Sequence, residues 1–327
     1  MTIEIMETGP MASIQDLGRK GFERFGVPPS GPMDRFSFMA ANLLVGNPVD
    51  LAELEISLMP LRLRCWQDGL AALCGRGFEL YKNGIKQPTW TAVSFRYGDE
   101  LFLPSVSSGW AVLAFSGGVI VPEVLGSKAT YARAGIGGIN GKNLQAGDLF
   151  VTGTPPSDSI FYAGASLPDE NIPEYRDSIK IGVVLGPHLE FFSEESISLF
   201  TSTTYRVSLD SDRMGYRLTG ETLPLLKPAD ILSEGLVMGA IQVSSSGQPM
   251  VMLADRPATG GYARIGTVIS ADLPLLVQSI PGETKIQFVP VDVETAQKKY
   301  KQQIKTLLNA VTIPTWNLLT AFSGALD

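Results

Sequence analysis

The fold is decided most clearly by residues 239–274, which read GAIQVSSSGQPMVMLADRPATGGYARIGTVISADLP. Two apolar segments flank the turn residues Ser246, Gly247 and Gln248, a pattern typical of a β-hairpin. Asp255 follows the second segment, and a glycine loop over residues 259–262 comes next. Glycines at such a turn allow a ligand to approach the backbone closely, and they equally allow a plain sharp turn. The stretch therefore predicts paired strands with a polar, glycine-rich edge.

Short apolar segments separated by turn residues continue through most of the chain. Asn83-Gly84 stands between two such segments and is a strong hairpin signal. The first helical candidate is at about 34–44, where Asp34 is the expected N-cap. The last clear helical spacing is at about 293–310, which has a basic, solvated face. The 34 Gly and 22 Pro residues also favour strands and turns over a helical bundle. We predict a mainly β (α+β) fold.

The chain length of 327 residues exceeds what one hydrophobic core usually holds, so two lobes are expected. Residues 153–178 are polar and rich in proline, which makes them the best candidate for a linker. We therefore predict an N-terminal β-rich lobe over 1–160 and a C-terminal lobe over 175–327 that includes the terminal helix.

Composition and charge exclude several classes of function. The net charge is −7 with a pI near 5.0, and no block of Lys and Arg offers a face for a phosphate backbone. No apolar run approaches the ~20 residues that span a bilayer, and the acidic N-terminus does not resemble a signal peptide. We expect a cytoplasmic protein that binds neither nucleic acid nor membrane, with Cys65 and Cys74 as reduced, buried thiols and without a metal-ligating cluster.

The single histidine, His188, limits the chemistry that the chain can support. A Ser–His–Asp triad or a histidine-ligated metal would depend on this one residue, and neither a nucleophile elbow nor a phosphate-binding P-loop occurs in the sequence. We interpret His188 as a turn residue that follows a strand. Acids, arginines, lysines and backbone amides must then carry any acid–base or phosphate chemistry.

Two segments combine polar side chains with turn residues. Residues 13–34 hold Asp16 and Arg19 among glycines and prolines, and residues 207–220 hold Asp212 and Arg213. Each segment predicts either a rigid loop that binds an anion or an internal acid–arginine pair that fastens the loop. A third segment, 115–148, is glycine-rich, but it lacks the βαβ context of a dinucleotide site.

The first two segments also share the pattern D-x-x-R-x-G-aromatic. The segment that begins at Glu55 is similarly echoed by the one that begins at Glu234. From these echoes we hypothesise that the two lobes arose by duplication.

Several long, ordered blocks together resemble the allophanate hydrolase subunit 2 family, a group of biotin-dependent carboxyltransferase-like proteins that includes the C component of 5-oxoprolinase and an antagonist of a sporulation antikinase. The resemblance runs from about residue 3 to 300. The blocks that carry it are SIQDLGR (13–19), GVPPSGPMD (26–34), ANLLVGN (41–47), LEI (54–56), SDRMGYRL (211–218), SEGLVMGAIQV (233–243), GQPMVMLADR (247–256) and TGGY (259–262).

This resemblance implies two β-barrel-like lobes, of which the C-terminal one is cyclophilin-like. It also implies a hetero-oligomer with two partner proteins, which resemble the A component and the antikinase-like B component of 5-oxoprolinase. The expected reaction is the ATP-dependent hydrolysis of 5-oxoproline to glutamate, with ATP and Mg²⁺ at a site shared with these partners. Biotin is expected only if the chain is instead a carboxyltransferase-like component.

The expected site combines acids with groups that bind anions. Arginine guanidinium groups match carboxylate and phosphate geometry, and acids position water or a metal. The predicted catalytic residues are Asp34, Glu55 and Asp255. The predicted substrate- or phosphate-binding residues are Arg19, Arg213, Gln242, Thr259, Gly260, Gly261 and Tyr262.

The chain departs from the family pattern next to this site. Pro257 and Ala258 stand where the family usually has Gln-Thr, and Ala263 stands where it has proline. The change removes an amide and a hydroxyl that could form hydrogen bonds. Two alternatives therefore stand beside a role in 5-oxoprolinase: a carboxyltransferase-like component of urea carboxylase type, and a non-enzymatic antagonist that binds an antikinase.

Overall fold

The computed structural model describes residues 2–58, 60–106 and 109–314, and it divides the chain into two compact units. Of the described residues, the first comprises those within 2–18, 34–172 and 306–314, and the second comprises 19–33 and 173–305. The main division, between Ile172 and Pro173, falls inside the predicted linker. The segment 19–33 belongs to the second unit, however, and the terminal helix is divided between the two units.

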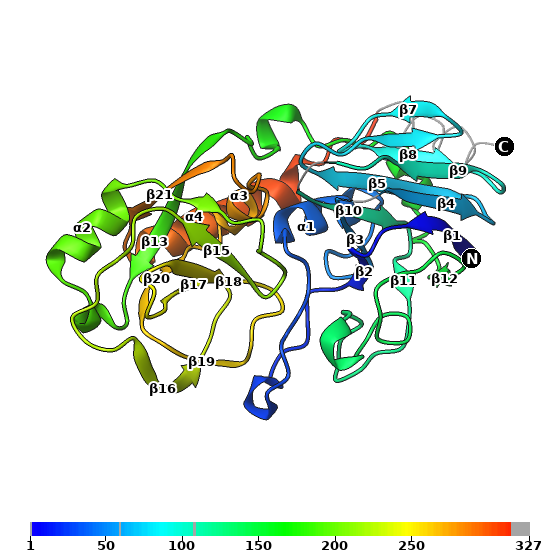
Figure 1. Ribbon diagram of the computed structural model, residues 1–327. Helices are drawn as coiled ribbons and strands as arrows, with labels where there is room; N and C mark the ends of the chain where they lie inside the picture. Colours follow the sequence, from blue (N-terminus) through cyan, green and yellow to red (C-terminus); the bar gives the residue numbers. More distant parts are fainter. Residues whose placement is uncertain (1, 59, 107–108, 315–327) are drawn as a thin grey trace. The chain divides into compact units, whose positions relative to one another are not determined.

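Two antiparallel sheets build the first unit (Figure 1). One has the order β11-β12-β1-β4-β9-β6-β7 and the other β2-β3-β10-β5-β8. Their strands, in chain order, are β1 (Thr2–Thr8), β2 (Ala12–Gln15), β3 (Glu53–Ser57), β4 (Leu61–Cys65), β5 (Gly69–Gly75), β6 (Leu80–Lys82), β7 (Ile85–Gln87), β8 (Ala92–Phe95), β9 (Glu100–Leu103), β10 (Trp110–Phe115), β11 (Val119–Ile120) and β12 (Leu149–Thr152).

The core of the first unit lies between these sheets. In β4, buried and half-buried residues alternate, as expected for a strand with one covered face. In β10, all six residues are buried, because its second face is covered by helix α1 (Arg35–Leu44). The apolar run WAVLAF therefore marks a strand that is covered on both sides.

The second unit is a barrel-like sheet with the order β14-β15-β18-β17-β20-β13-β21. Its strands are β13 (Ser178–Leu185), β14 (Arg206–Val207), β15 (Gly215–Thr219), β17 (Ala240–Val243), β18 (Pro249–Met252), β20 (Arg264–Val268) and β21 (Lys285–Pro290). Tyr205, directly before β14, exchanges two backbone hydrogen bonds of 2.8 Å with Ile286 of β21. These bonds join the two ends of the sheet and nearly close it.

Helices and a separate ribbon complete the second unit. The helices are α2 (Glu194–Ser202), α3 (Leu273–Val277) and the part of α4 (Val293–Ala310) that ends at Lys305. The two-stranded ribbon consists of β16 (Asp230–Gly235) and β19 (Thr259–Tyr262). Short 3-10 turns occur in the second unit at Glu23–Phe25 and Leu189–Phe191, and in the first unit at Ala132–Ala134, Ser159–Tyr162 and Asp169–Asn171. Figure 1 shows the ribbon to one side of the barrel strands.

The mainly β prediction is confirmed, and the second unit has the barrel-like sheet that was expected. The first unit, also expected to be barrel-like, consists of two separate sheets. Asp34 is the N-cap of α1, α4 covers the predicted residues, and Asn83-Gly84 turns between β6 and β7 with φ of 50° and 78°. Two further expectations fail. Residues 259–262 form a strand rather than a glycine loop, because they pair with β16. The duplication hypothesis is not supported, because the units differ in strand order and Arg19 and Arg213 both belong to the second.

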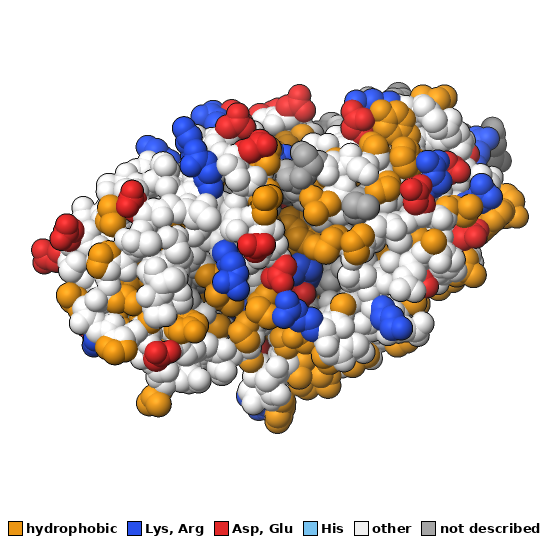
Figure 2. Space-filling model, viewed as in Figure 1, with side chains coloured by type: hydrophobic (Ala, Val, Ile, Leu, Met, Phe, Trp, Pro, Cys, Tyr) orange, Lys and Arg blue, Asp and Glu red, His pale blue; other side chains and the backbone are white. Residues whose placement is uncertain are grey.

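The surface carries charged side chains of both signs, as the composition predicts. Figure 2 shows acidic and basic side chains interspersed over the described residues of the viewed face. Among the described residues, no helix is both long and apolar enough to cross a membrane.

Candidate functional site

Arg213 and Asp255, predicted as an anion-binding and a catalytic residue, are paired with each other. Arg213 lies between β14 and β15, and its Nε and Nη2 donate to Asp255 Oδ2 and Oδ1 at 2.9 and 3.2 Å. Nη2 also donates to the carbonyl oxygen of Gly31 at 2.7 Å. With side-chain exposures of 14% and 13%, this two-pronged pair is only weakly screened by water. Any ligand that Arg213 binds must share the guanidinium with Asp255.

Arg19, the other predicted anion-binding arginine, is fully buried, and its backbone N–H donates to Pro29 O at 2.8 Å. Asp16, which we considered as its internal partner, accepts hydrogen bonds from Ser127 Oγ and the Lys128 N–H, both at 2.6 Å. Asp16 therefore fastens two loops of the first unit to each other.

Asp34 and Glu55, two predicted catalytic acids, lie in the first unit, and the other predicted site residues lie in the second. Asp34 caps α1: its Oδ1 accepts from the Ser37 N–H at 3.0 Å and its Oδ2 from Ser37 Oγ at 2.7 Å. Glu55 lies in β3, between β2 and β10, and is 1% exposed. The capping contacts give Asp34 a structural role, whatever its part in chemistry.

Gln242, Gly260 and Tyr262 form one corner where the ribbon meets the barrel. Gln242, on β17, is 4% exposed, and its Nε2 donates to Tyr262 O at 3.4 Å. Gly260 lies so close that a Cβ atom there would be 2.4 Å from Gln242 Nε2. A side chain at position 260 would therefore have to displace the Gln242 carboxamide, and Thr259 and Gly261 continue the same strand.

A pocket of about 520 Å³ opens beside this corner. Its walls come from β15, β17, β18, the β17–β18 turn and the ribbon, all in the second unit. The lining residues that bear on its chemistry are Arg217, Gln242, Ser244, Gln248, Met250 and Tyr262. Its size lies in the range of small-molecule sites, and it combines one cation with amides, hydroxyls and an apolar floor.

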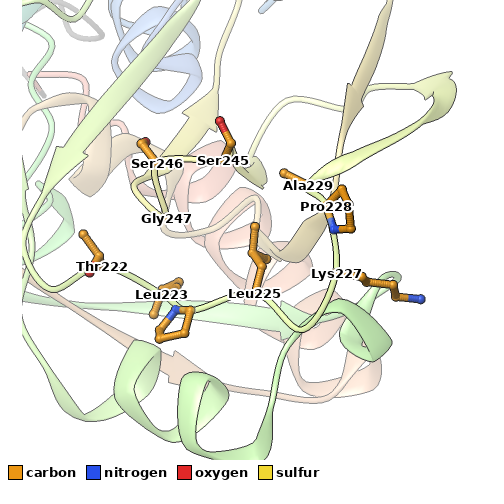
Figure 3. Close-up of a pocket in the computed structure, with 10 residues that line it drawn as sticks. Thr222, Leu223, Leu225, Lys227, Pro228, Ala229, Ser245, Ser246 and Gly247 are labelled. Atoms are coloured by element: carbon orange, nitrogen blue, oxygen red, sulfur yellow. The ribbon is translucent and has the colours of Figure 1, made fainter.

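A smaller pocket of about 320 Å³ lies on the other side of the β17–β18 turn (Figure 3). Figure 3 shows the segment 222–229 and the turn 245–247 as its walls, with the Lys227 side chain directed away from the cavity. Lys227 Nζ instead lies over the Phe191 ring, 4.1 Å from its centroid. Without a charged group directed inward, this pocket is less suited to an anionic ligand than the larger one.

The first unit contains a buried polar network that sequence reasoning missed. Glu53, fully buried on β3, accepts hydrogen bonds from the Phe115 N–H at 2.9 Å and from Asn47 Nδ2 at 3.0 Å. Asn47 also accepts from the Gly117 N–H at 2.8 Å and donates to Asn42 Oδ1 at 3.0 Å. Burial raises the pKa of Glu53 well above its ordinary value, and these hydrogen bonds and the charge of Lys128 oppose the rise. The network joins the end of α1 to the centre of a sheet.

The cysteines and the histidine have structural surroundings. Cys65 and Cys74 are free and buried, as predicted. Burial and then the charge of Asp99 raise the pKa of Cys65 to about 12, so that its thiol stays protonated at neutral pH. His188 Nδ1 accepts a hydrogen bond from the Arg264 N–H at 3.1 Å.

No group of three or more His, Cys, Asp or Glu side chains able to hold a metal is found in the described part of the chain.

Arg217, Ser244, Gln248 and Met250 were not among the predicted site residues. The exposed position of Arg217 could be anticipated from its alternation with the buried neighbours Tyr216 and Leu218, whereas Gln242 is buried like the other residues of β17. Which strand lies beside which could not be anticipated, since that depends on long-range pairing.

The strand order and the polar pocket define a β-rich protein with a small-molecule-sized pocket in its barrel-like unit. Residues 25–290 match the family described as "Carboxyltransferase domain, subdomain A and B", and the chain belongs to this family. It is 35% identical over 302 residues to the C component of Escherichia coli 5-oxoprolinase, covering 92% of this chain and 95% of that protein.

Urea-metabolising enzymes are also similar to this chain. It is 33% identical over 317 residues to urea amidolyase of Saccharomyces cerevisiae, which is 92% of this chain but 17% of that protein. The crystal structure of Kluyveromyces lactis urea carboxylase superimposes with a TM-score of 0.88 at 30% identity, over 94% of this chain and 29% of that one. The chain thus corresponds to one part of these larger enzymes, and to nearly the whole of the 5-oxoprolinase C component.

Proposed function

We propose that this chain acts as the C component of an ATP-dependent 5-oxoprolinase, which hydrolyses 5-oxoproline to glutamate together with A-like and B-like partner proteins. The observation that carries the proposal is the 35% identity with the C component of the E. coli enzyme, which covers nearly the full length of both chains. The polar pocket supports it, because the pocket is large enough for a small organic acid and holds a guanidinium. We also propose a cytoplasmic location.

The chemistry suits a chain with one histidine. A lactam is a stable amide, and ATP would supply the activation by phosphorylating the carbonyl oxygen. The protein then needs to orient the substrate and stabilise negative charge, and arginine guanidinium groups and backbone amides do both. We assign ATP and Mg²⁺ to a site shared with the partner proteins. Arg19 and Arg213 are proposed to bind carboxylate or phosphate, and Asp34, Glu55 and Asp255 to position water or metal.

Reconstitution tests this proposal. The chain is combined with the A and B components of a 5-oxoprolinase, and glutamate release from 5-oxoproline is measured with and without ATP. The C component of the E. coli enzyme in the same mixture is the positive control. We expect ATP-dependent release with either chain; release with the E. coli protein but not with this one would contradict the proposal.

A second candidate is a carboxyltransferase that accepts carboxybiotin, supported by the TM-score of 0.88 with urea carboxylase. Biotin would then be the cofactor, carried by a partner. In this case transfer of the carboxyl group from a carboxylated biotin carrier to urea would depend on this chain, and 5-oxoproline would not be consumed.

A further inference from the structure

Three side chains form a row on one face of the barrel sheet. Met250 of β18 lies directly opposite Arg217 of β15 and directly opposite Gln242 of β17. Residues opposite each other in antiparallel strands point to the same face, so the three lie side by side in the order Arg217, Met250, Gln242. All three line the 520 Å³ pocket. Across the sheet, the row therefore offers a cation, then an apolar floor and then an amide.

Arg217 supplies the charge in this pocket. It is the one ionisable side chain other than the Tyr262 phenol among the twelve residues that line the pocket. Its guanidinium forms no ion pair with any residue that the structure describes. Arg213, four residues earlier in the chain, is by contrast held by Asp255. The Arg217 side chain is exposed, and Ser, Thr and Gln side chains line the same pocket. A guanidinium in such a site attracts a small anion, and its planar fork matches a carboxylate.

Gln242 supplies a fixed amide at the other end of the row. The contact between its Nε2 and Tyr262 O, together with the approach of Gly260, orients the carboxamide. With Nε2 donating to Tyr262, Oε1 is the acceptor, and within the described residues no donor reaches it. This oxygen is therefore placed to accept a hydrogen bond from an N–H group of a ligand.

We propose that this row is a recognition subsite for a small carboxylate that carries an N–H group, with the carboxylate on Arg217, the N–H on Gln242 Oε1 and the aliphatic part on Met250. Neighbouring strands lie ~4.8 Å apart, so the backbones of Arg217 and Gln242 are separated by about 10 Å, which the long arginine side chain can bridge. The inference rests on the proposed function and deepens it, because 5-oxoproline has both groups on one small ring and urea has no carboxylate.

Binding of three probes to the full-length chain tests the subsite, with ligand-observed NMR as the readout. The probes are 5-oxoproline, 2-pyrrolidinone, which lacks the carboxylate, and the lactone analogue of 5-oxoproline, which has oxygen in place of N–H. We expect 5-oxoproline to bind best. Arg217→Gln should weaken 5-oxoproline about 10- to 100-fold and leave 2-pyrrolidinone unchanged. Gln242→Leu should remove the preference for the lactam over the lactone.

Arg206→Gln is the matched control, because Arg206 lies on β14 of the same barrel and does not line the pocket. Equal loss of 5-oxoproline binding in Arg217→Gln and Arg206→Gln, or no loss in either, would overturn the subsite. Turnover in the reconstituted assembly separates the two proposals. Binding that depends on Arg217 without ATP-dependent turnover retains the subsite and rejects the proposed function. ATP-dependent turnover whose kcat/KM is unaffected by Arg217→Gln retains the proposed function and rejects the subsite.

Discussion

Gly260 and Gly261 are neighbours in β19 that differ sharply in their surroundings. A Cβ atom at position 260 would lie 2.4 Å from Gln242 Nε2 and 2.7 Å from Leu236 Cδ1, whereas one at 261 would meet nothing closer than 3.5 Å. We therefore expect Gly260→Ala to displace the Gln242 carboxamide and to lower the free energy of unfolding by ~1–3 kcal/mol. Gly261→Ala, the matched control, should change it by less than ~0.5 kcal/mol. Urea unfolding measures both, and equal effects would contradict the assigned close approach.

Glu53 should make the stability of the fold depend on pH, and the direction of this dependence follows from the shift in its pKa. Its pKa in the folded protein is raised above the unfolded value, chiefly by burial. A carboxyl of this kind stabilises the fold fully below its unfolded pKa, and that contribution is lost as the pH rises through the folded pKa. The stability of the wild type relative to Glu53→Gln should therefore fall with rising pH above about 4.5, by at most ~1.4 kcal/mol per pH unit.

The measurement is urea unfolding followed by tryptophan fluorescence between pH 4 and 8. The described tryptophans, Trp66, Trp90 and Trp110, all lie in the first unit, so the signal reports on the unit that contains Glu53. A difference between wild type and Glu53→Gln that is constant over this range would show that the folded pKa is not raised.

At the residue scale, the sequence predicted which residues belong to the candidate site better than it predicted which residues contact each other. Arg213 and Asp255 were both selected, and the structure pairs them. Gln242 was selected, yet Arg217 was not, although both line the same pocket. Local patterns show which side chains face outward, but the partner of each depends on contacts between residues far apart in the chain.

At the scale of a single element, the stability of helix α1 depends on its N-cap, Asp34. Asp34 satisfies the Ser37 N–H and accepts from Ser37 Oγ, so Asp34→Ala should lower the free energy of unfolding by ~1–2 kcal/mol. Asp34→Asn, which is also a good N-cap, should remain close to the wild type. Unfolding curves compare the two variants, and equal losses would contradict the capping role. Turnover of Asp34→Asn in the reconstituted assembly then tests the predicted catalytic role separately, because its stability is retained.

Elements with strong local signals were predicted well. Helix α4, the cap of α1 and the Asn83-Gly84 turn each follow from spacing or from one turn dipeptide. The ribbon was missed because Thr259–Tyr262 contains two glycines, which favour a loop on local grounds. Pairing with β16 and the close approach to Gln242 override that preference.

The whole molecule departs most from the sequence-based prediction, because its compact units are not continuous in sequence. Residues 19–33 belong to the second unit, where the carbonyl oxygen of Gly31 accepts a hydrogen bond from Arg213. Composition and proline content located a linker near the main division, but neither can show that a segment close to the N-terminus completes a unit formed by residues 173–305.

This organisation predicts how the second unit behaves by itself. A fragment of residues 173–305 lacks the segment 19–33, which leaves Arg213 without the Gly31 acceptor. Joining 19–33 to the fragment through a flexible linker should restore a charge-assisted hydrogen bond and the surrounding contacts. We expect a gain of ~1–3 kcal/mol, or a rise in the unfolding midpoint of roughly 3–10 °C. Thermal unfolding followed by circular dichroism measures it. The control carries residues 19–33 in scrambled order on the same linker, and an equal midpoint for both fusions would refute the assignment of this segment to the second unit.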